Sequence, residues 1–190
     1  FILPTTTPVH FDPEALVAGW IAAEGGAQKA RRPFSPADDV PGPYRGRGND
    51  SEWGARLADI LRAIMDKDFA VIGRDCDRAV RTEHPGARGG WGRAFAETEW
   101  MRLRAAFPRA RFEVHHVIGR EAPRQPPRAA VRWSLHGEHA GHGRYGPPSG
   151  ATVHVMGMTH AEWGPWGFRR ECTLFDELAI WKQILIHRGA

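Results

Sequence analysis

Asp176 is the residue whose type and position best suit proton-transfer chemistry. It follows a stretch in which Cys172 and Leu174 alternate with it, so the three side chains should lie on one face of a strand. If that face lines an apolar cavity with aromatic walls, the loss of hydration strengthens the carboxylate as a base. The same position also suits the N-cap of a helix that begins at Glu177. The sequence leaves both interpretations open, and they do not fully exclude each other.

A histidine, His160, could assist this carboxylate. It lies in phase with Met158 along a long predicted strand, and a hairpin would bring it near Cys172 or Asp176. An imidazole beside a carboxylate can orient it, share a proton or polarise a substrate carbonyl. The alternative is a half-buried histidine of the sheet without a chemical role.

Three histidines, His136, His139 and His142, are spaced three residues apart and raise the question of a metal site. On a strand such residues alternate between faces, and Gly137 and Gly141 argue against a helix. No cysteine or clear carboxylate partner completes a zinc site. The sequence also lacks metalloprotease, phosphate-loop and nucleophile-elbow signatures. We therefore expect neither a metal ion nor another cofactor.

The elements that must position these residues are helices followed by strands. Apolar residues recur at helical spacing after Ser51, a second short helix holds Phe69 to Ile72, and a third is expected from Trp91 to Ala106. The predicted strands are 75–84, 111–118, 129–137, 152–163 and 168–175, and a closing helix follows over 177–187. This order indicates an α+β fold in which a strongly bent sheet wraps around about three helices.

Residues 1–50 differ from the rest of the chain. Residues 1–11 suggest an extended arm, and Asp12-Pro13 opens a short helix with Asp12 as its N-cap. Residues 24–50 are rich in Gly, Pro and Arg without periodicity, which predicts a linker. The segment is either a flexible tail or an arm that packs on another domain or a partner subunit. We divide the chain into this N-terminal segment and a main domain over residues 51–190.

Composition argues against several classes of function. The formal net charge is +4, but the arginines are scattered among acidic residues, so we expect no nucleic-acid partner. The sequence has no stretch of about 18 apolar residues that would predict a membrane span. Residues 1–9 are too short and too broken by proline for a signal peptide. Two cysteines, Cys76 and Cys172, make no disulfide framework, which favours the cytoplasm.

Four segments of the main domain resemble the SnoaL-like polyketide cyclases, a family of the nuclear transport factor 2-like superfamily. In order, they are Ala106–Val114 (AFPRARFEV), Val131–Gly141 (VRWSLHGEHAG), Tyr145–Gly150 (YGPPSG) and Phe175–Ile184 (FDELAIWKQI). Each segment alone is a weak signal, but their order and spacing together are specific. Residues 1–50 have no counterpart in a single domain of this family.

The resemblance implies a cone-shaped fold and a homodimer in which the open faces of the sheets meet. It implies an apolar pocket for a small hydrophobic ligand, in which Asp176 matches the acid that takes and returns a proton during an aldol cyclisation. It also places the turn between His84 and Trp91 near the pocket mouth. The eight Trp residues of the chain could supply the pocket walls. The candidate ligand contacts are His84, Trp91, Trp100, His116, Trp133, His139, Met158 and Cys172.

The chain also departs from the family pattern. Cys172 stands where many relatives have Trp, and Arg170 replaces a common acid, so the pocket floor should differ. We expect a cofactor-independent cyclase or isomerase that acts on a hydrophobic carbonyl substrate, with Asp176 as general acid and base and His160 assisting. The alternative is a non-catalytic ligand-binding or dimerisation module, or a domain that works only in a larger assembly. An outward-facing Asp176 and an interior filled by Trp side chains would favour the non-catalytic alternative.

Overall fold

The computed structural model describes residues 12–38 and 46–189. The extended arm expected over residues 1–11 lies outside these described residues. Within them, six strands form one sheet in the order β2-β1-β6-β5-β4-β3, in which β1 and β6 run parallel and the other neighbours antiparallel. The strands are β1 (Cys76–His84), β2 (Arg88–Trp91), β3 (Arg111–Ala122), β4 (Gln125–Glu138), β5 (Thr152–Gly164) and β6 (Gly167–Phe175).

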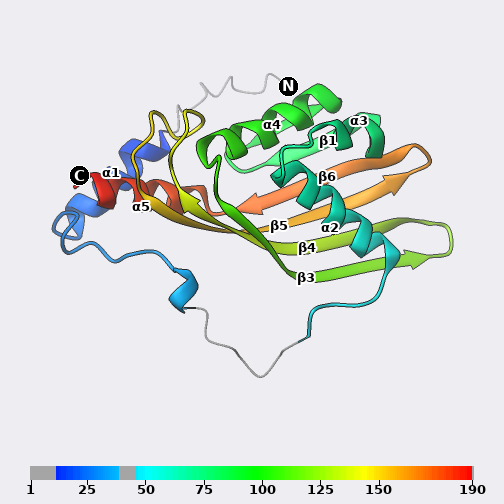
Figure 1. Ribbon diagram of the computed structural model, residues 1–190, viewed down its shortest axis with the longest axis horizontal. Coiled ribbons are helices and arrows are strands. Elements are labelled where there is room, and N and C mark those ends of the chain that lie inside the picture. The colour runs from blue at the N-terminus through cyan, green and yellow to red at the C-terminus, as the bar shows by residue number, and fades with distance from the viewer. Residues whose placement is uncertain (1–11, 39–45, 190) are drawn as a thin grey trace, which may run out of the picture.

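Three helices cover one face of this curved sheet, and two more lie side by side at one end (Figure 1). The first three are α2 (Glu52–Met65), α3 (Ala70–Asp75) and α4 (Arg93–Ala106), and the other two are α1 (Pro13–Ala23) and α5 (Glu177–Arg188). A short 3₁₀ helix, η1, spans Pro36–Asp38. Among the described residues, no helix has the length and apolar content needed to cross a membrane.

Alternation along the strands separates a helix-covered inner face from an outer face. In β5, every second residue from Val153 to Trp163 is buried, whereas Met156 and Met158 between them are exposed. The inner face packs against the apolar stripes of the helices. Trp100, Trp133 and Trp163 are among the largest fully buried side chains of this core. The sheet and its helices therefore enclose a core rich in indole rings.

Trp133 shows how closely this core is packed. Its ring lies over Gly157, its partner on β5, and a Cβ atom added there would lie only 2.3 Å from Cζ2 of the indole. The Nε1–H of the same ring donates a 3.0 Å hydrogen bond to Thr159 Oγ1. The sequence left the direction of Trp133 open, and the structure directs it inward.

The described part of the N-terminal segment packs on the main domain of its own chain. Val17 and Ile21 of α1 are fully buried against α5, and Lys182 of α5 forms a 2.6 Å ion pair with Glu24. Further along, Asn49 hydrogen-bonds to the backbone of Gly119 in β3. These contacts join the segment to α5 and to the β3 edge of the sheet.

Aspartates begin two of the helices. The carboxylate of Asp12 accepts a hydrogen bond from Ala15 N, and that of Asp176 accepts one from Ala179 N at 2.9 Å. These are the N-cap contacts expected for α1 and α5. Gly189, with a φ of 79°, ends α5 in the left-handed conformation that glycine adopts without strain.

The Gly157→Ala substitution should destabilise the protein by about 1–3 kcal/mol, because the new methyl group would overlap the Trp133 ring. Gly73→Ala in α3 is the matched control, since nothing lies within 4 Å of a Cβ atom there. The free energy of unfolding from urea titrations measures both. Equal stability of the two variants would contradict the packing of Trp133 on Gly157.

The Asp176→Ala substitution should lower the free energy of unfolding by about 1 kcal/mol, because α5 loses its N-terminal cap. Asp176→Asn should keep the stability of the parent, since the amide oxygen of Asn can accept the same bond. The same urea titrations compare the two variants. An Ala variant as stable as the Asn variant would show that the cap contributes nothing measurable.

Candidate functional site

The buried carboxylate at the centre of the inner face belongs to Glu171. This residue of β6 is 1% exposed and lies beside Thr82 of β1 in the parallel pair. Thr173 and Phe175 share its face, whereas Cys172 and Leu174 alternate with them on the outer face. An isolated carboxylate in such a place would be strongly destabilising, so its partners decide what it can do.

Three side chains donate hydrogen bonds to this carboxylate. Thr173 donates to Oε1 at 2.6 Å, and Trp100 Nε1–H donates to Oε2 at 3.2 Å. The third partner is Nε2 of His84, 3.0 Å from Oε1, on a side chain that is itself buried. Glu171 is therefore held by groups from β1, α4 and β6, and the polar cost of its burial is offset within the protein.

A directional chain of hydrogen bonds extends from Glu171 into the core. Indole Nε1–H can only donate, so Thr159 Oγ1 accepts from Trp133. A carboxylate can only accept, so Thr173 donates its proton to Glu171, and Thr159 must donate across the 2.9 Å contact to Thr173. Each hydroxyl thus points towards the carboxylate, and the bonds polarise one another in the same direction.

His84 has one nitrogen committed to Glu171 and one available. Because the carboxylate accepts, Nε2 of His84 carries the shared proton, and Nδ1 bears the lone pair when the imidazole is neutral. Among the described residues, no group hydrogen-bonds to Nδ1 of His84 or to Oγ1 of Thr82, and both atoms are buried. The His84 ring packs edge-on against Trp100 at 5.0 Å. The arrangement presents one basic nitrogen inside an apolar, aromatic surrounding.

The turn that follows His84 is held in place by Arg144, a residue outside the Glu171 cluster. Arg144 donates to the carbonyl oxygen of Pro85 at 3.0 Å and forms a close ion pair with Glu177 at the start of α5. Its guanidinium also lies 5.8 Å from the Phe175 ring centroid. These contacts connect the end of β1 to α5, and so hold His84 in position from the adjacent backbone.

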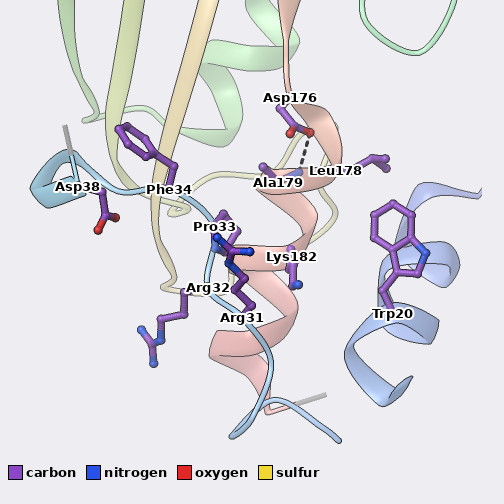
Figure 2. A pocket seen from close by; sticks show the side chains of 10 residues that line it. All are labelled: Trp20, Arg31, Arg32, Pro33, Phe34, Asp38, Asp176, Leu178, Ala179 and Lys182. Carbon is purple, nitrogen blue, oxygen red and sulfur yellow. Dashed lines mark hydrogen bonds between the residues drawn. The ribbon is translucent and has the colours of Figure 1, made fainter. Parts of the chain in front are cut away.

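Asp176 lies apart from this cluster. Its side chain is exposed, caps α5 and lines an open groove of about 740 Å³ between α5 and the N-terminal segment. Figure 2 shows its carboxylate bonded to Ala179, with Arg31, Arg32 and Trp20 on the other groove walls. The structure therefore differs from the expected buried position, because the inward phase of β6 belongs to Glu171 and Thr173.

His160, Met158 and Cys172 all lie on the outer face. His160 pairs with Cys172 across the β5–β6 hairpin, and Met158 pairs with Leu174. Burial lowers the pKa of His160, and the nearby Arg128 lowers it further. Burial also raises the pKa of the Cys172 thiol. The structure thus brings His160 together with Cys172 but with neither Asp176 nor Glu171.

The remaining candidates divide between the two faces. Trp100 and Trp133 lie inside, as does His84, whereas Trp91 is exposed on the outer side. His116 also faces outward, because a β-bulge between Val114 and His116 sets it opposite Arg132.

His139 is part of the packed interior. It is buried against Phe107 and Tyr145, and its Nδ1 contacts Ser149 Oγ at 2.9 Å. Burial lowers its pKa. Among the described residues, no three His, Cys, Asp or Glu side chains gather closely enough to hold a metal ion.

The sequence contained one indication that Glu171 lies on the buried face of β6, although the alternation of residues alone did not show which face is buried. Phe175 at the end of β6 is a large buried residue that shares its phase with Glu171, although the buried Phe168 at the start of the strand has the opposite phase. A bulky aromatic side chain marks the buried face more strongly than Cys172 or Leu174 does. Thr159 and Thr173 gave no comparable signal, because threonine is common on either face of a sheet.

No protein-family model matches the chain, and no curated protein matches it significantly. Solved structures do match it. A candidate SnoaL-like polyketide cyclase from Jannaschia sp. CCS1 has a TM-score of 0.58 and 19% identity, over 72% of this chain and 96% of the other. IdmH, a candidate polyketide cyclase from Streptomyces antibioticus, has a TM-score of 0.57 and 15% identity, over 70% of this chain and 99% of its own.

A third match has another assigned activity. AclR from Streptomyces galilaeus, a candidate hydroxylase, has a TM-score of 0.55 and 16% identity, over 66% of this chain and 89% of its own. At such identities the likeness concerns the fold, and different activities share it. The resemblance predicted from the four sequence segments is confirmed at this level. The chain has the cone-shaped, nuclear transport factor 2-like α+β fold of the SnoaL-like polyketide cyclases.

Proposed function

We propose that the protein is a cofactor-independent cyclase or isomerase that acts on a hydrophobic carbonyl substrate, with His84 as general acid and base. The observation that supports this proposal most directly is the buried pair of His84 and Glu171, joined at 3.0 Å inside the cone. Buried ionisable pairs occur both at functional sites and in structural networks, and this pair has one imidazole nitrogen without a hydrogen-bond partner among the described residues. The fully buried indole rings of Trp100 and Trp133 pack beside this pair, so a carbonyl substrate must displace part of the core packing to reach Nδ1 of His84.

In the proposed reaction, Nδ1 of His84 takes the proton from the carbon next to the substrate carbonyl. The enolate carbon then bonds to a second carbonyl carbon, and His84 returns the proton to the new alkoxide oxygen. In an isomerisation, the proton returns to a different carbon instead. Glu171 keeps its bond to Nε2–H throughout and stabilises the imidazolium that forms between the two proton transfers.

We assign the acid and base role to His84 instead of Asp176. The exposed Asp176 carboxylate lines the open groove beside α5 and accepts the Ala179 N–H bond as the cap of that helix, so it lies outside the aromatic core. His84 lies inside that core, where its bond to Glu171 fixes the orientation of the imidazole.

The second candidate function is a non-catalytic ligand-binding or dimerisation module of the same fold. Two observations favour it, since Asp176 faces outward and Trp100, Trp133 and Trp163 fill the interior. Under this alternative the Glu171 cluster serves to specify the core packing. A test of proton transfer separates the two functions.

The test measures exchange of the α-protons of 2-tetralone with solvent in D₂O by proton NMR. The parent protein should accelerate exchange, and His84→Ala should lower the rate by about 10²–10⁴-fold, because the base is lost. Added imidazole should restore part of the rate, since it can enter the space left by the side chain. Asp176→Asn should retain the parent rate.

Glu171→Gln should also lower the rate, because the imidazolium loses its counter-charge. Its amide N–H₂ would face other donors, so a loss of about 1–3 kcal/mol in the free energy of unfolding is expected and must be measured alongside. Full activity of His84→Ala with loss in Asp176→Asn would return the role to Asp176. Binding of 2-tetralone without any accelerated exchange would support the non-catalytic module.

We also propose that the protein is a cytoplasmic homodimer formed through the outer faces of two sheets. Met156, Met158 and Leu174 are exposed there, and Met158 lies opposite Leu174 on the neighbouring strand. A face of this kind is stabilised when a second sheet covers it. Both cysteines are free thiols, which suits a reducing compartment.

Light scattering coupled to size exclusion should therefore report a dimer. Met158→Glu should shift the protein to a monomer, because it places a charge in the centre of the apolar contact. Met101→Glu on α4, also exposed but on the opposite side of the fold, is the control and should remain dimeric. A monomeric parent protein at high concentration would contradict the proposed interface.

A further inference from the structure

A second groove lies on the outer face, away from His84 and Glu171. It has a volume of about 680 Å³ and lies between β1, the short strand β2 and the hairpin that joins β5 to β6. Two tryptophans line it, Trp91 at 68% exposure and Trp166 at 77%. Such exposure is unusual, because indole rings are normally buried unless they meet a partner or a ligand.

Trp91 is presented in a fixed position. The guanidinium of Arg81 lies 5.4 Å from the centroid of its ring, close enough for a cation–π contact. Arg81 is in turn held by Glu83 at 3.5 Å and passes over Gly89, where a Cβ atom would lie 2.6 Å from its Nη2. One guanidinium can cover only one face of the indole, so the other face remains available to a ligand.

The position of Trp166 is set by the backbone conformation of the turn between β5 and β6. The adjacent Gly167 has a φ of 117°, and a Cβ atom there would lie 2.3 Å from the carbonyl oxygen of Asp75. Only glycine combines this conformation with such a close approach. The turn is therefore fixed against the end of α3, and the exposed ring is displayed from a constrained backbone.

The groove is lined by equal numbers of positively and negatively charged side chains. Its arginines are Arg81, Arg169 and Arg170, and its carboxylates are Asp77, Glu83 and Glu162. The Arg170–Glu83 contact of 3.4 Å is exposed and weak, and the described contacts give Arg169 no ion pair. A groove with balanced charges does not select a polyanion or a polycation. It offers both donors and acceptors at its rim, beside two flat apolar platforms.

We propose that this groove binds a neutral oligosaccharide. A pyranose ring has an apolar face of C–H groups that can pack on an indole, and a rim of hydroxyls that both donate and accept hydrogen bonds. Carboxylates and guanidinium groups are bidentate partners for neighbouring hydroxyls. A proline-rich peptide would also pack on the tryptophans, but its prolines have no N–H groups to donate to the carboxylates at the rim.

The test titrates the full chain with five neutral hexasaccharides, namely cellohexaose, maltohexaose, xylohexaose, mannohexaose and chitohexaose. Tryptophan fluorescence and calorimetry follow the binding. At least one sugar should bind, and Trp91→Ala and Trp166→Ala should each weaken it by about tenfold or more. Trp20→Ala, in the groove beside α5, is the matched control and should bind like the parent.

The inference fails if no hexasaccharide binds, or if both groove variants bind as the parent does. It also fails if decaproline binds in a manner that depends on Trp91 and Trp166 while the sugars do not. The result is independent of the proposed reaction. His84→Ala should bind the sugar normally, and the two groove variants should keep the exchange activity of the parent.

Discussion

The structure depends on a carboxylate that is buried in an apolar interior. Removing such a group from water costs several kcal/mol, and only well-placed donors offset that cost. The donors to Glu171 come from His84 on β1, Trp100 on α4 and Thr173 on β6, so the positions of these three elements are coupled through one side chain. The carboxylate that constrains the core packing is thus also the group that orients the candidate base.

Much of the fold follows from local patterns, but one element does not. The alternation in β5 and the helical stripe of α2 are strong periodic signals, and they correspond to what the structure contains. The short strand β2 was missed, since the stretch between His84 and Trp91 was assigned to a turn that precedes the predicted helix. Gly89 and Gly90 have little strand propensity, and they suit β2 because Arg81 and the ring of Phe95 occupy the space beside them. Only tertiary contacts reveal that fit.

The site was less predictable than the fold, because its side chains depend on strand phase. A shift of one residue in β6 exchanges Glu171 for Cys172 on the inner face, and the family likeness directed attention to Asp176. A bulge in β3 likewise turned His116 outward, and no sequence signal marked it. The pairing of His84 with Glu171 was beyond any local pattern, since the two residues are 87 positions apart.

The parallel pairing of β1 with β6 has a consequence for how the protein acquires its chemistry. This pairing joins the first strand of the main domain to its last strand. Along the chain, β3, β4 and β5 separate the two, but in the sheet these three strands all lie on the far side of β6. Contacts of such long range form slowly, because the loop must close before the contact is gained. A nascent or partly unfolded chain can hold local hairpins and helices and still have no joined His84 and Glu171. The proposed activity would therefore report on completion of the whole cone.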